Sequence, residues 1–138
     1  GKPYWRLRVA VWYSEYGLPE TSFEFPYKTR SPSIGKVLEY KSKNEVYEEI
    51  NRLLNEKGTR KYGIGQSLFL QMPFFCNPVY FISSWCWEMI NDYQVVKEFH
   101  IPIAKDLDSA NSWQLDCFNI IQSEINNIFK YQRSKNGN

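Results

Sequence analysis

Histidine is almost absent from this chain, since His100 is the only one among 138 residues. Nucleophilic catalysis of the Ser–His or Cys–His kind needs a base beside an activated nucleophile. We interpret His100 as a helix-end residue, because histidine commonly meets the free carbonyls at that position. The sequence offers no nucleophile–base pair, and we predict no catalytic residue.

Cysteine is also scarce, with the odd number of three: Cys76, Cys86 and Cys117. No pair has the CxxC spacing, and one histidine cannot complete a zinc ligand set. Cys86 and Cys117 lie within apolar helical patterns, which is typical of buried thiols in a reducing compartment. We therefore expect a cytoplasmic protein with no metal, no cofactor and no disulfide-linked partner.

Long hydrophobic runs are missing as well. The uninterrupted apolar stretches are far too short to span a bilayer, so no membrane partner is expected. No basic segment is followed by an apolar one, and no signal peptide is expected. The length and an apolar content of 43% predict one globular domain over 1–138, in which the polar stretch 133–138 frays.

The glycine pattern excludes the common phosphate-binding loops. Gly63 and Gly65 lack the third glycine and the following helix of a dinucleotide fingerprint. Gly35 and Lys36 are followed by Val37, where a P-loop needs serine or threonine. These glycines are predicted to lie in turns.

Acidic residues leave one enzymatic alternative open. Asp106 and Asp108 immediately precede a predicted helix, where carboxylates cap the first turn and favour the helix dipole. Glu88 and Asp92 lie one helical turn apart and are most simply solvated. Read instead as metal ligands, such carboxylates would favour a metal-dependent nuclease.

Aromatic side chains are abundant, at 17% of the chain. The segment Asn77–Phe99 combines an N-cap asparagine, proline at the first helical position and apolar residues spaced by four and three. The stripe consists of Ile82, Cys86, Met89, Tyr93 and Val96. We predict that this helix is the centre of the domain and that the other elements cover it.

The other elements follow from periodicity and from start and stop signals. Ser42 and Glu45 form a capping box that opens a helix, and Gly58 ends it. The remaining predictions are a strand over Tyr4–Ser14, a short strand at Phe23–Phe25, a basic loop over Lys28–Ser33, a strand over Lys36–Lys41, a strand over Leu68–Met72 and a helix over Ser109–Gln132. The order β-β-β-α-β-α-α predicts an α+β fold, with a small, mostly antiparallel sheet of about four strands packed on one face by about three helices.

Charge is unevenly distributed. Residues 1–62 have a net charge of +4 and residues 63–138 a net charge of −2. On the predicted first strand, Arg6 and Arg8 share the outward face with Trp12, and an arginine-rich sheet face with aromatic residues can hold single-stranded nucleic acid. The candidate contacts are Arg6, Arg8, Trp12, Lys28, Arg30, Lys36, Arg60 and Lys61. The alternative is an ordinary solvated sheet face.

The predicted central helix carries a second candidate surface. At 100° per residue, Tyr80, Ser84, Trp87 and Asn91 fall on one line away from the main apolar stripe. Large aromatic residues on a polar face are enriched at protein interfaces. The alternative is that another layer of the domain covers this line.

We interpret the sequence as a non-catalytic interaction module, a small subunit of a larger protein or nucleoprotein assembly. A protein partner is expected, and the basic face is an accessory contact for RNA or DNA. The alternative is an inhibitor or immunity-type protein that binds a toxin or nuclease, which needs a recognition face and no catalytic groups. The metal-dependent nuclease is the second alternative.

Overall fold

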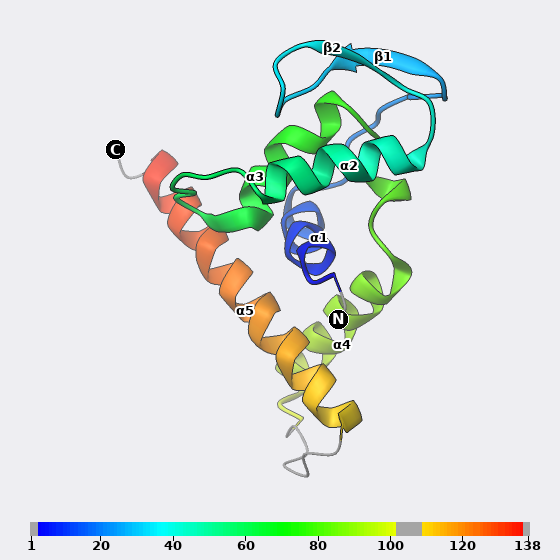
Figure 1. Cartoon of the computed structure of the whole chain (residues 1–138). Helices are drawn as coiled ribbons and strands as arrows, with labels where there is room; N and C mark the ends of the chain where they lie inside the picture. Colours follow the sequence, from blue (N-terminus) through cyan, green and yellow to red (C-terminus); the bar gives the residue numbers. More distant parts are fainter. Residues whose placement is uncertain (1–2, 102–108, 137–138) are drawn as a thin grey trace.

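The computed structural model describes residues 3–101 and 109–136, and helices dominate this range (Figure 1). In chain order, the elements are α1 (Trp5–Tyr16), β1 (Tyr27–Arg30), β2 (Val37–Tyr40), α2 (Lys43–Leu54), α3 (Gly63–Gln71), the 3₁₀ turns η1 (Met72–Phe74) and η2 (Pro78–Tyr80), α4 (Ser84–Phe99) and α5 (Ser109–Asn136). Asp106 and Asp108 lie outside the described residues. The polar stretch that begins at residue 133 is helical as far as Asn136.

The predicted α+β fold with about four strands is wrong. The described part of the chain has five α-helices and one sheet of two strands. The predicted strand over Tyr4–Ser14 falls on α1, and the one over Leu68–Met72 falls on α3 and the start of η1. Period-two alternation misled the prediction in both places because the polar and apolar residues of these two helices do not separate onto opposite faces, so neither shows a clear 3.6-residue pattern.

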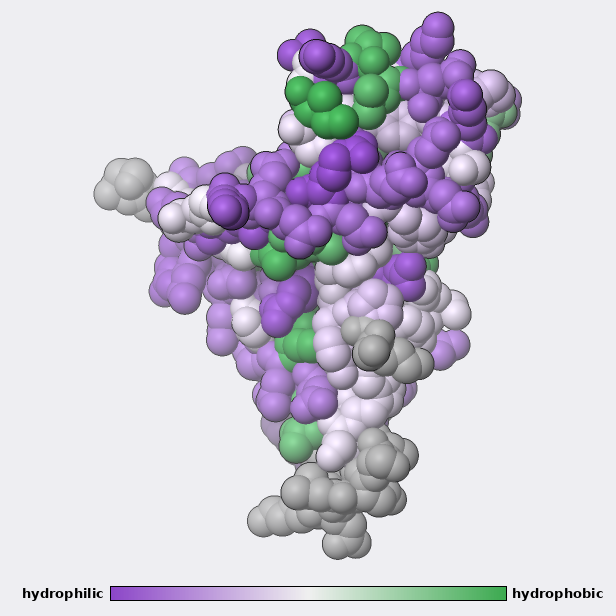
Figure 2. Space-filling model, in the orientation of Figure 1, coloured by the Kyte–Doolittle hydropathy of each residue, from purple (hydrophilic) through white to green (hydrophobic). Residues whose placement is uncertain are grey.

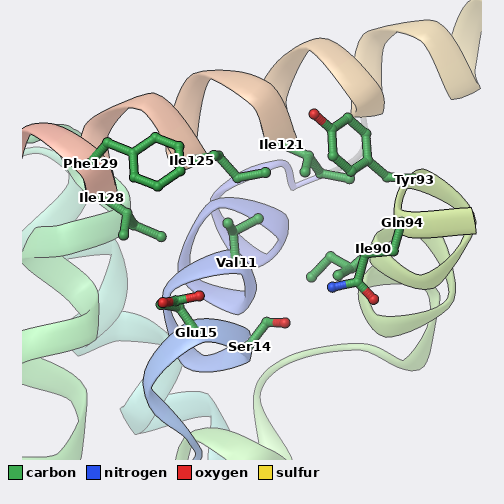
Figure 3. Close-up of a pocket in the computed structure, with 10 residues that line it drawn as sticks. All are labelled: Val11, Ser14, Glu15, Ile90, Tyr93, Gln94, Ile121, Ile125, Ile128 and Phe129. Carbon is green, nitrogen blue, oxygen red and sulfur yellow. The ribbon is translucent and has the colours of Figure 1, made fainter. Parts of the chain in front are cut away.

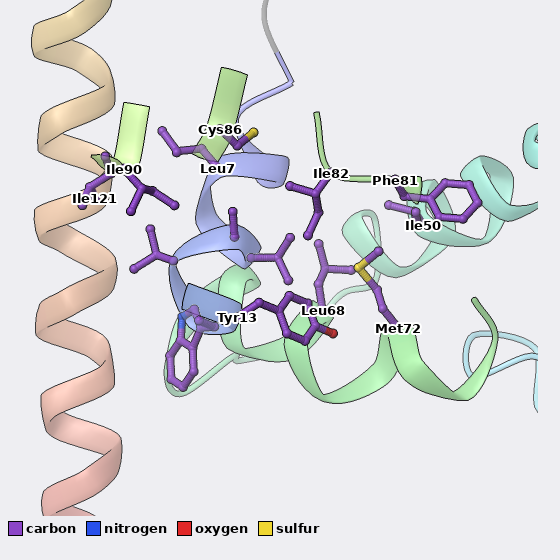
Figure 4. Close-up of a cluster of buried hydrophobic side chains, with 14 of the residues drawn as sticks. Leu7, Tyr13, Ile50, Leu68, Met72, Phe81, Ile82, Cys86, Ile90 and Ile121 are labelled. Carbon is purple, nitrogen blue, oxygen red and sulfur yellow. The ribbon is translucent and has the colours of Figure 1, made fainter. Parts of the chain in front are cut away.

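The domain is built around α1 and not around the segment Asn77–Phe99. Leu7, Val9 and Trp12 of α1 are fully buried. In Figure 1 α1 lies between α4 and α5 and beneath α2 and α3, and Figure 4 shows its apolar side chains enclosed by these helices. The helix ends at Gly17, whose N–H donates to the carbonyl of Tyr13 at 2.8 Å. Gly17 has a φ of 89°, which an L-side chain rarely adopts, so this glycine is a good stop signal.

The predicted helix Asn77–Phe99 is interrupted. Asn77 does cap a helical turn, because its Oδ1 accepts the N–H of Val79 at 3.2 Å. That turn is only η2, however, and the backbone becomes extended at Ser83 before α4 begins. Burial of Phe81 and Ile82 in the core accompanies the break. His100 closes α4 in a left-handed conformation, with a φ of 53°, so the predicted helix-end position of this histidine is confirmed.

The predicted helix after Ser42 is confirmed as α2. Ser42 stands at the N-cap position and the carboxylate of Glu45 accepts the N–H of Lys41, one residue earlier than in a standard capping box. At the other end the guanidinium of Arg60 donates to the carbonyls of Leu53 at 2.6 Å and Leu54 at 3.4 Å. Arg60 therefore satisfies carbonyls that the end of a helix leaves without partners.

The hairpin of β1 and β2 is antiparallel, with Tyr27 opposite Tyr40 and Arg30 opposite Val37. Its second strand confirms the prediction over Lys36–Lys41. The first strand of the hairpin, β1, was predicted too early, at Phe23–Phe25. The observed β1 occupies part of the segment that was predicted to be a basic loop. Side chains on this strand alternate between half-buried and exposed positions, which allows basic residues to occupy the outer positions of a two-stranded ribbon.

A buried carboxylate fastens the hairpin to α2. Glu49 is fully buried and accepts hydrogen bonds from Ser31 Oγ at 2.5 Å, from the Ser33 N–H at 3.0 Å, from Tyr40 Oη at 3.1 Å and from Arg52 at 2.7 Å. Burial acts to raise the pKa of Glu49, but the hydrogen bonds from Ser31, Ser33 and Arg52 outweigh it and hold the pKa below its usual value.

Candidate functional site

An aromatic groove lies where the hairpin, the start of α2 and η2 meet. Its volume is about 540 Å³, within the range of small-molecule and peptide pockets. We call it the aromatic groove, and its lining residues are Phe23, Glu24, Phe25, Tyr27, Lys43, Asn77, Tyr80 and Phe81. Five of these eight side chains are aromatic, an unusual concentration for a surface position.

One wall of the groove is a row of packed aromatic rings that continues into the core. The ring centroid of Tyr27 lies 4.8 Å from that of Phe23 and 5.2 Å from that of Phe25. Behind it, Tyr27 stacks on Tyr40 at 5.5 Å, and Tyr40 stacks on Phe75 at 6.2 Å. The hydroxyl of Tyr27 donates to the carbonyl of Phe75 at 2.6 Å, and burial raises its pKa. The wall is therefore held in place before any ligand binds.

The other wall carries exposed aromatic surface and a cation. Tyr80 is 63% exposed, and the ammonium of Lys43 lies 5.9 Å from the ring centroids of both Tyr80 and Phe81. At this distance the ammonium is attracted to the ring faces, and it still presents its charge to the groove. Asn77 links the two walls, because its Nδ2 donates to the carbonyl of Thr21 at 3.3 Å.

The four predicted protein-interface residues do not form one line. Tyr80 belongs to η2 and lines the aromatic groove, whereas Ser84, Trp87 and Asn91 lie on α4 beyond the interruption at Ser83. Ser84 and Asn91 are exposed, and Trp87 is half-buried against the core. The break in the helix separates Tyr80 from the other three, since a common line needs one continuous helix.

The predicted basic sheet face does not exist, because Arg6, Arg8 and Trp12 lie on α1. The guanidinium of Arg6 lies over the rings of Trp5 and Tyr47, at 5.2 and 5.3 Å from their centroids. Its Nη1 is 3.5 Å from Ser83 Oγ. This side chain is only partly exposed and packs α1 against α2 and α4.

Arg8 and Trp12 meet a second buried carboxylate, Glu124 of α5. Arg8 pairs with Glu124 at 2.6 Å, and the indole N–H of Trp12 donates to the other carboxylate oxygen at 2.9 Å. Trp12 is fully buried. A Cβ on Gly65 of α3 would lie 2.5 Å from this carboxylate, so only glycine fits there.

The other five basic candidates are separated from one another. Lys28, Arg30 and Lys36 are exposed on the hairpin and its turn. Arg60 caps the carbonyls at the end of α2, and Lys61 lies 5.5 Å from the ring centroid of Tyr62. Figure 2 shows hydrophilic residues spread over this side of the molecule, with hydrophobic residues gathered over the hairpin. The hairpin lysines and arginine remain the candidates for contact with nucleic acid.

Acidic residues and cysteines are the remaining titratable candidates for a reacting centre. Among the described residues, no three histidine, cysteine or acidic side chains gather where they could hold a metal ion. Glu88 and Asp92 are exposed on α4. Burial raises the pKa of Cys86 to about 12 and raises the pKa of Cys76 as well, so these thiols are protonated at neutral pH.

Sequence reasoning did not identify Phe23, Phe25 and Lys43 as members of a site. The available signal was the aromatic spacing at Phe23, Phe25 and Tyr27, which continues across Pro26. Such spacing by two places side chains on one side of an extended segment. Lys43 carried no such signal, because the contact with Tyr80 joins residues distant in the sequence.

Comparison of this chain with protein-family models, with curated proteins and with solved structures found no match in any of the three. No described helix is both long and apolar enough to cross a membrane.

Proposed function

We propose that this chain is a non-catalytic interaction module that binds an extended segment of a protein partner in the aromatic groove. The observation that carries the proposal is the juxtaposition of stacked rings with the exposed ring of Tyr80 and the ammonium of Lys43. Aromatic-lined grooves on small domains recognise extended peptides, and proline-rich segments above all, because such peptides lose little conformational entropy on binding.

The charged residues of the aromatic groove narrow the class of peptide that it can bind. Lys43 and Glu24 both line it, one of each sign, so they can fix the direction in which a peptide lies. The ammonium of Lys43 favours a peptide with a carboxylate beside an apolar or proline residue. The aromatic rings supply contact area at a low entropic cost.

The test is selection of peptides from a displayed random library with the whole chain as bait. Tyr80→Ala should weaken the selected peptides about thirtyfold, the ratio that about 2 kcal/mol represents. Its free energy of unfolding should change by less than about 1 kcal/mol, because the ring is 63% exposed. Phe74→Ala is the matched control, since Phe74 is 70% exposed and lies outside the groove.

Two results would contradict the proposal. One is a selection whose peptides bind the Tyr80→Ala and Phe74→Ala variants equally well. The other is tight binding of a single-stranded oligonucleotide that Tyr80→Ala abolishes and that weakens steeply with salt, because counterion release is typical of nucleic-acid binding.

A further inference from the structure

A second, smaller cavity lies between α1, α4 and α5 and shares no residue with the aromatic groove. Its volume is about 160 Å³, close to that of an engineered apolar cavity that binds benzene. Figure 3 shows Val11 of α1 between the isoleucines of α5 and Ile90 of α4. We call this space the three-helix cavity.

The interior of the three-helix cavity is apolar. Val11, Ile90, Ile121 and Ile128 are at most 6% exposed. Tyr93 directs its hydroxyl elsewhere, to the side-chain carbonyl of Gln122. An apolar space of this size accepts a ring or a branched alkyl group of about six to eight non-hydrogen atoms.

The rim of the cavity is polar and carries one charge. Ser14, Glu15 and Gln94 are its exposed polar residues, and Phe129, 56% exposed, adds an aromatic ring. Glu15 is the only charged side chain of the lining. Among the described residues its carboxylate has no ion pair within 4.0 Å, since the three salt bridges involve other residues.

Two further features add negative potential at this rim. Ser14 and Glu15 stand in the last turn of α1, where the backbone carbonyls carry the negative end of the helix dipole. No basic residue in that turn offsets it. The face of an aromatic ring such as Phe129 also attracts cations.

We infer that the three-helix cavity binds a small organic ammonium ion, whose aromatic or branched alkyl group fills the interior and whose ammonium meets Glu15 at the rim. The apolar shape of the cavity and the negative charge of Glu15 together favour a small organic ammonium ion. A neutral molecule of the same shape forgoes the attraction of the carboxylate, and an anion is repelled by it.

Benzylammonium, benzyl alcohol and phenylacetate are suitable probes, because they place a cation, a neutral group and an anion on the same ring. Titration of the whole chain, followed by NMR of isoleucine methyl groups, should shift the signals of Ile90, Ile121, Ile125 and Ile128. Benzylammonium should bind about fivefold more tightly than benzyl alcohol, the factor expected for a partly exposed ion pair of about 1 kcal/mol. Phenylacetate should bind most weakly.

Substitutions distinguish the contribution of the Glu15 charge to ligand affinity from the contribution of the cavity shape. Glu15→Gln should remove the preference for benzylammonium and leave the affinity for benzyl alcohol within twofold. Glu20→Gln, an exposed carboxylate outside the cavity, should leave the preference intact. Ile125→Trp, at a half-buried lining position, should reduce the affinity for all three probes by filling the space.

Three outcomes would overturn the inference. The first is binding of phenylacetate as tight as that of benzylammonium. The second is a cation preference that survives Glu15→Gln. The third is a set of isoleucine shifts that depends on protein concentration alone, because a second copy of the chain would then occupy the cavity. None of these outcomes depends on Tyr80, so failure here leaves the proposal for the aromatic groove standing.

Discussion

Two buried carboxylates hold two parts of this molecule together by different means. Glu49 fastens the hairpin to α2 with partners between three and eighteen residues away, whereas Glu124 joins α5 to Arg8 and Trp12, more than one hundred residues away. Both meet an arginine and an aromatic donor. Glu49 has two serine donors in addition, through Ser31 Oγ and the Ser33 N–H.

The number of hydrogen-bond donors around each carboxylate indicates where the fold depends on single contacts. Several donors satisfy Glu49, so the loss of one leaves the others in place. Among the described residues, the hydrogen-bond partners of Glu124 are Arg8 and Trp12, and the loss of either leaves a buried charge poorly compensated. We therefore expect the α1–α5 contact to be more sensitive to substitution than the hairpin.

Trp12→Ala should have the largest effect, a loss of about 4 kcal/mol or more in the free energy of unfolding. The change empties the centre of the core and removes a donor from Glu124. Trp12→Phe keeps most of the ring volume and should cost about half as much. Chemical denaturation measures both, and a loss below about 1 kcal/mol for Trp12→Ala would show that α1 is not the central helix.

Replacing the arginine partner of each buried carboxylate with methionine compares Glu124 and Glu49 directly. Arg8→Met should cost about 3 kcal/mol, because it leaves Glu124 with the indole N–H of Trp12 as its donor. Arg52→Met should cost about 1 to 2 kcal/mol, because the serine and tyrosine donors remain on Glu49. The two arginines are equally exposed, at 33% and 35%, so solvent screening cancels in the comparison. Equal losses would refute the distinction.

The smallest effect concerns pH and Glu49. Its pKa in the folded chain lies below the usual value of 4.5, so the ionised carboxylate stabilises the fold above about pH 4.5. This contribution is lost as the pH falls through the folded-state pKa. The difference in urea midpoint between the wild type and Glu49→Gln should therefore shrink as the pH is lowered from 5 to 3. A difference independent of pH would contradict the hydrogen-bond network described for Glu49.

Local signals allowed part of this fold to be predicted. Ser42 and Glu45 mark the start of α2 as predicted, because caps act through neighbouring residues, whereas the predicted stop at Gly58 lies beyond the observed end of α2 at Leu54. The final helix has a long apolar stripe and was predicted correctly from Ser109 onward. His100 was placed correctly at a helix end for the same reason.

The centre of the molecule could not be predicted in this way. The apolar residues of α1 do not keep to one face of the helix, and only the surrounding helices decide that the segment is helical. Glu124 and Glu49 were not singled out, because nothing in the neighbouring sequence indicates that Glu124 meets Arg8 or that Glu49 meets Ser31. The aromatic groove escaped prediction for the same reason, since Tyr80 and Lys43 meet only in the folded chain.

The most direct test of the central claim is the position of a selected peptide on the whole chain. Intermolecular NOEs measured by NMR should connect the peptide to the ring protons of Phe25 and Tyr80 and to the side chain of Lys43. NOEs confined to rings outside the aromatic groove, such as Phe74 or Phe129, would contradict the account.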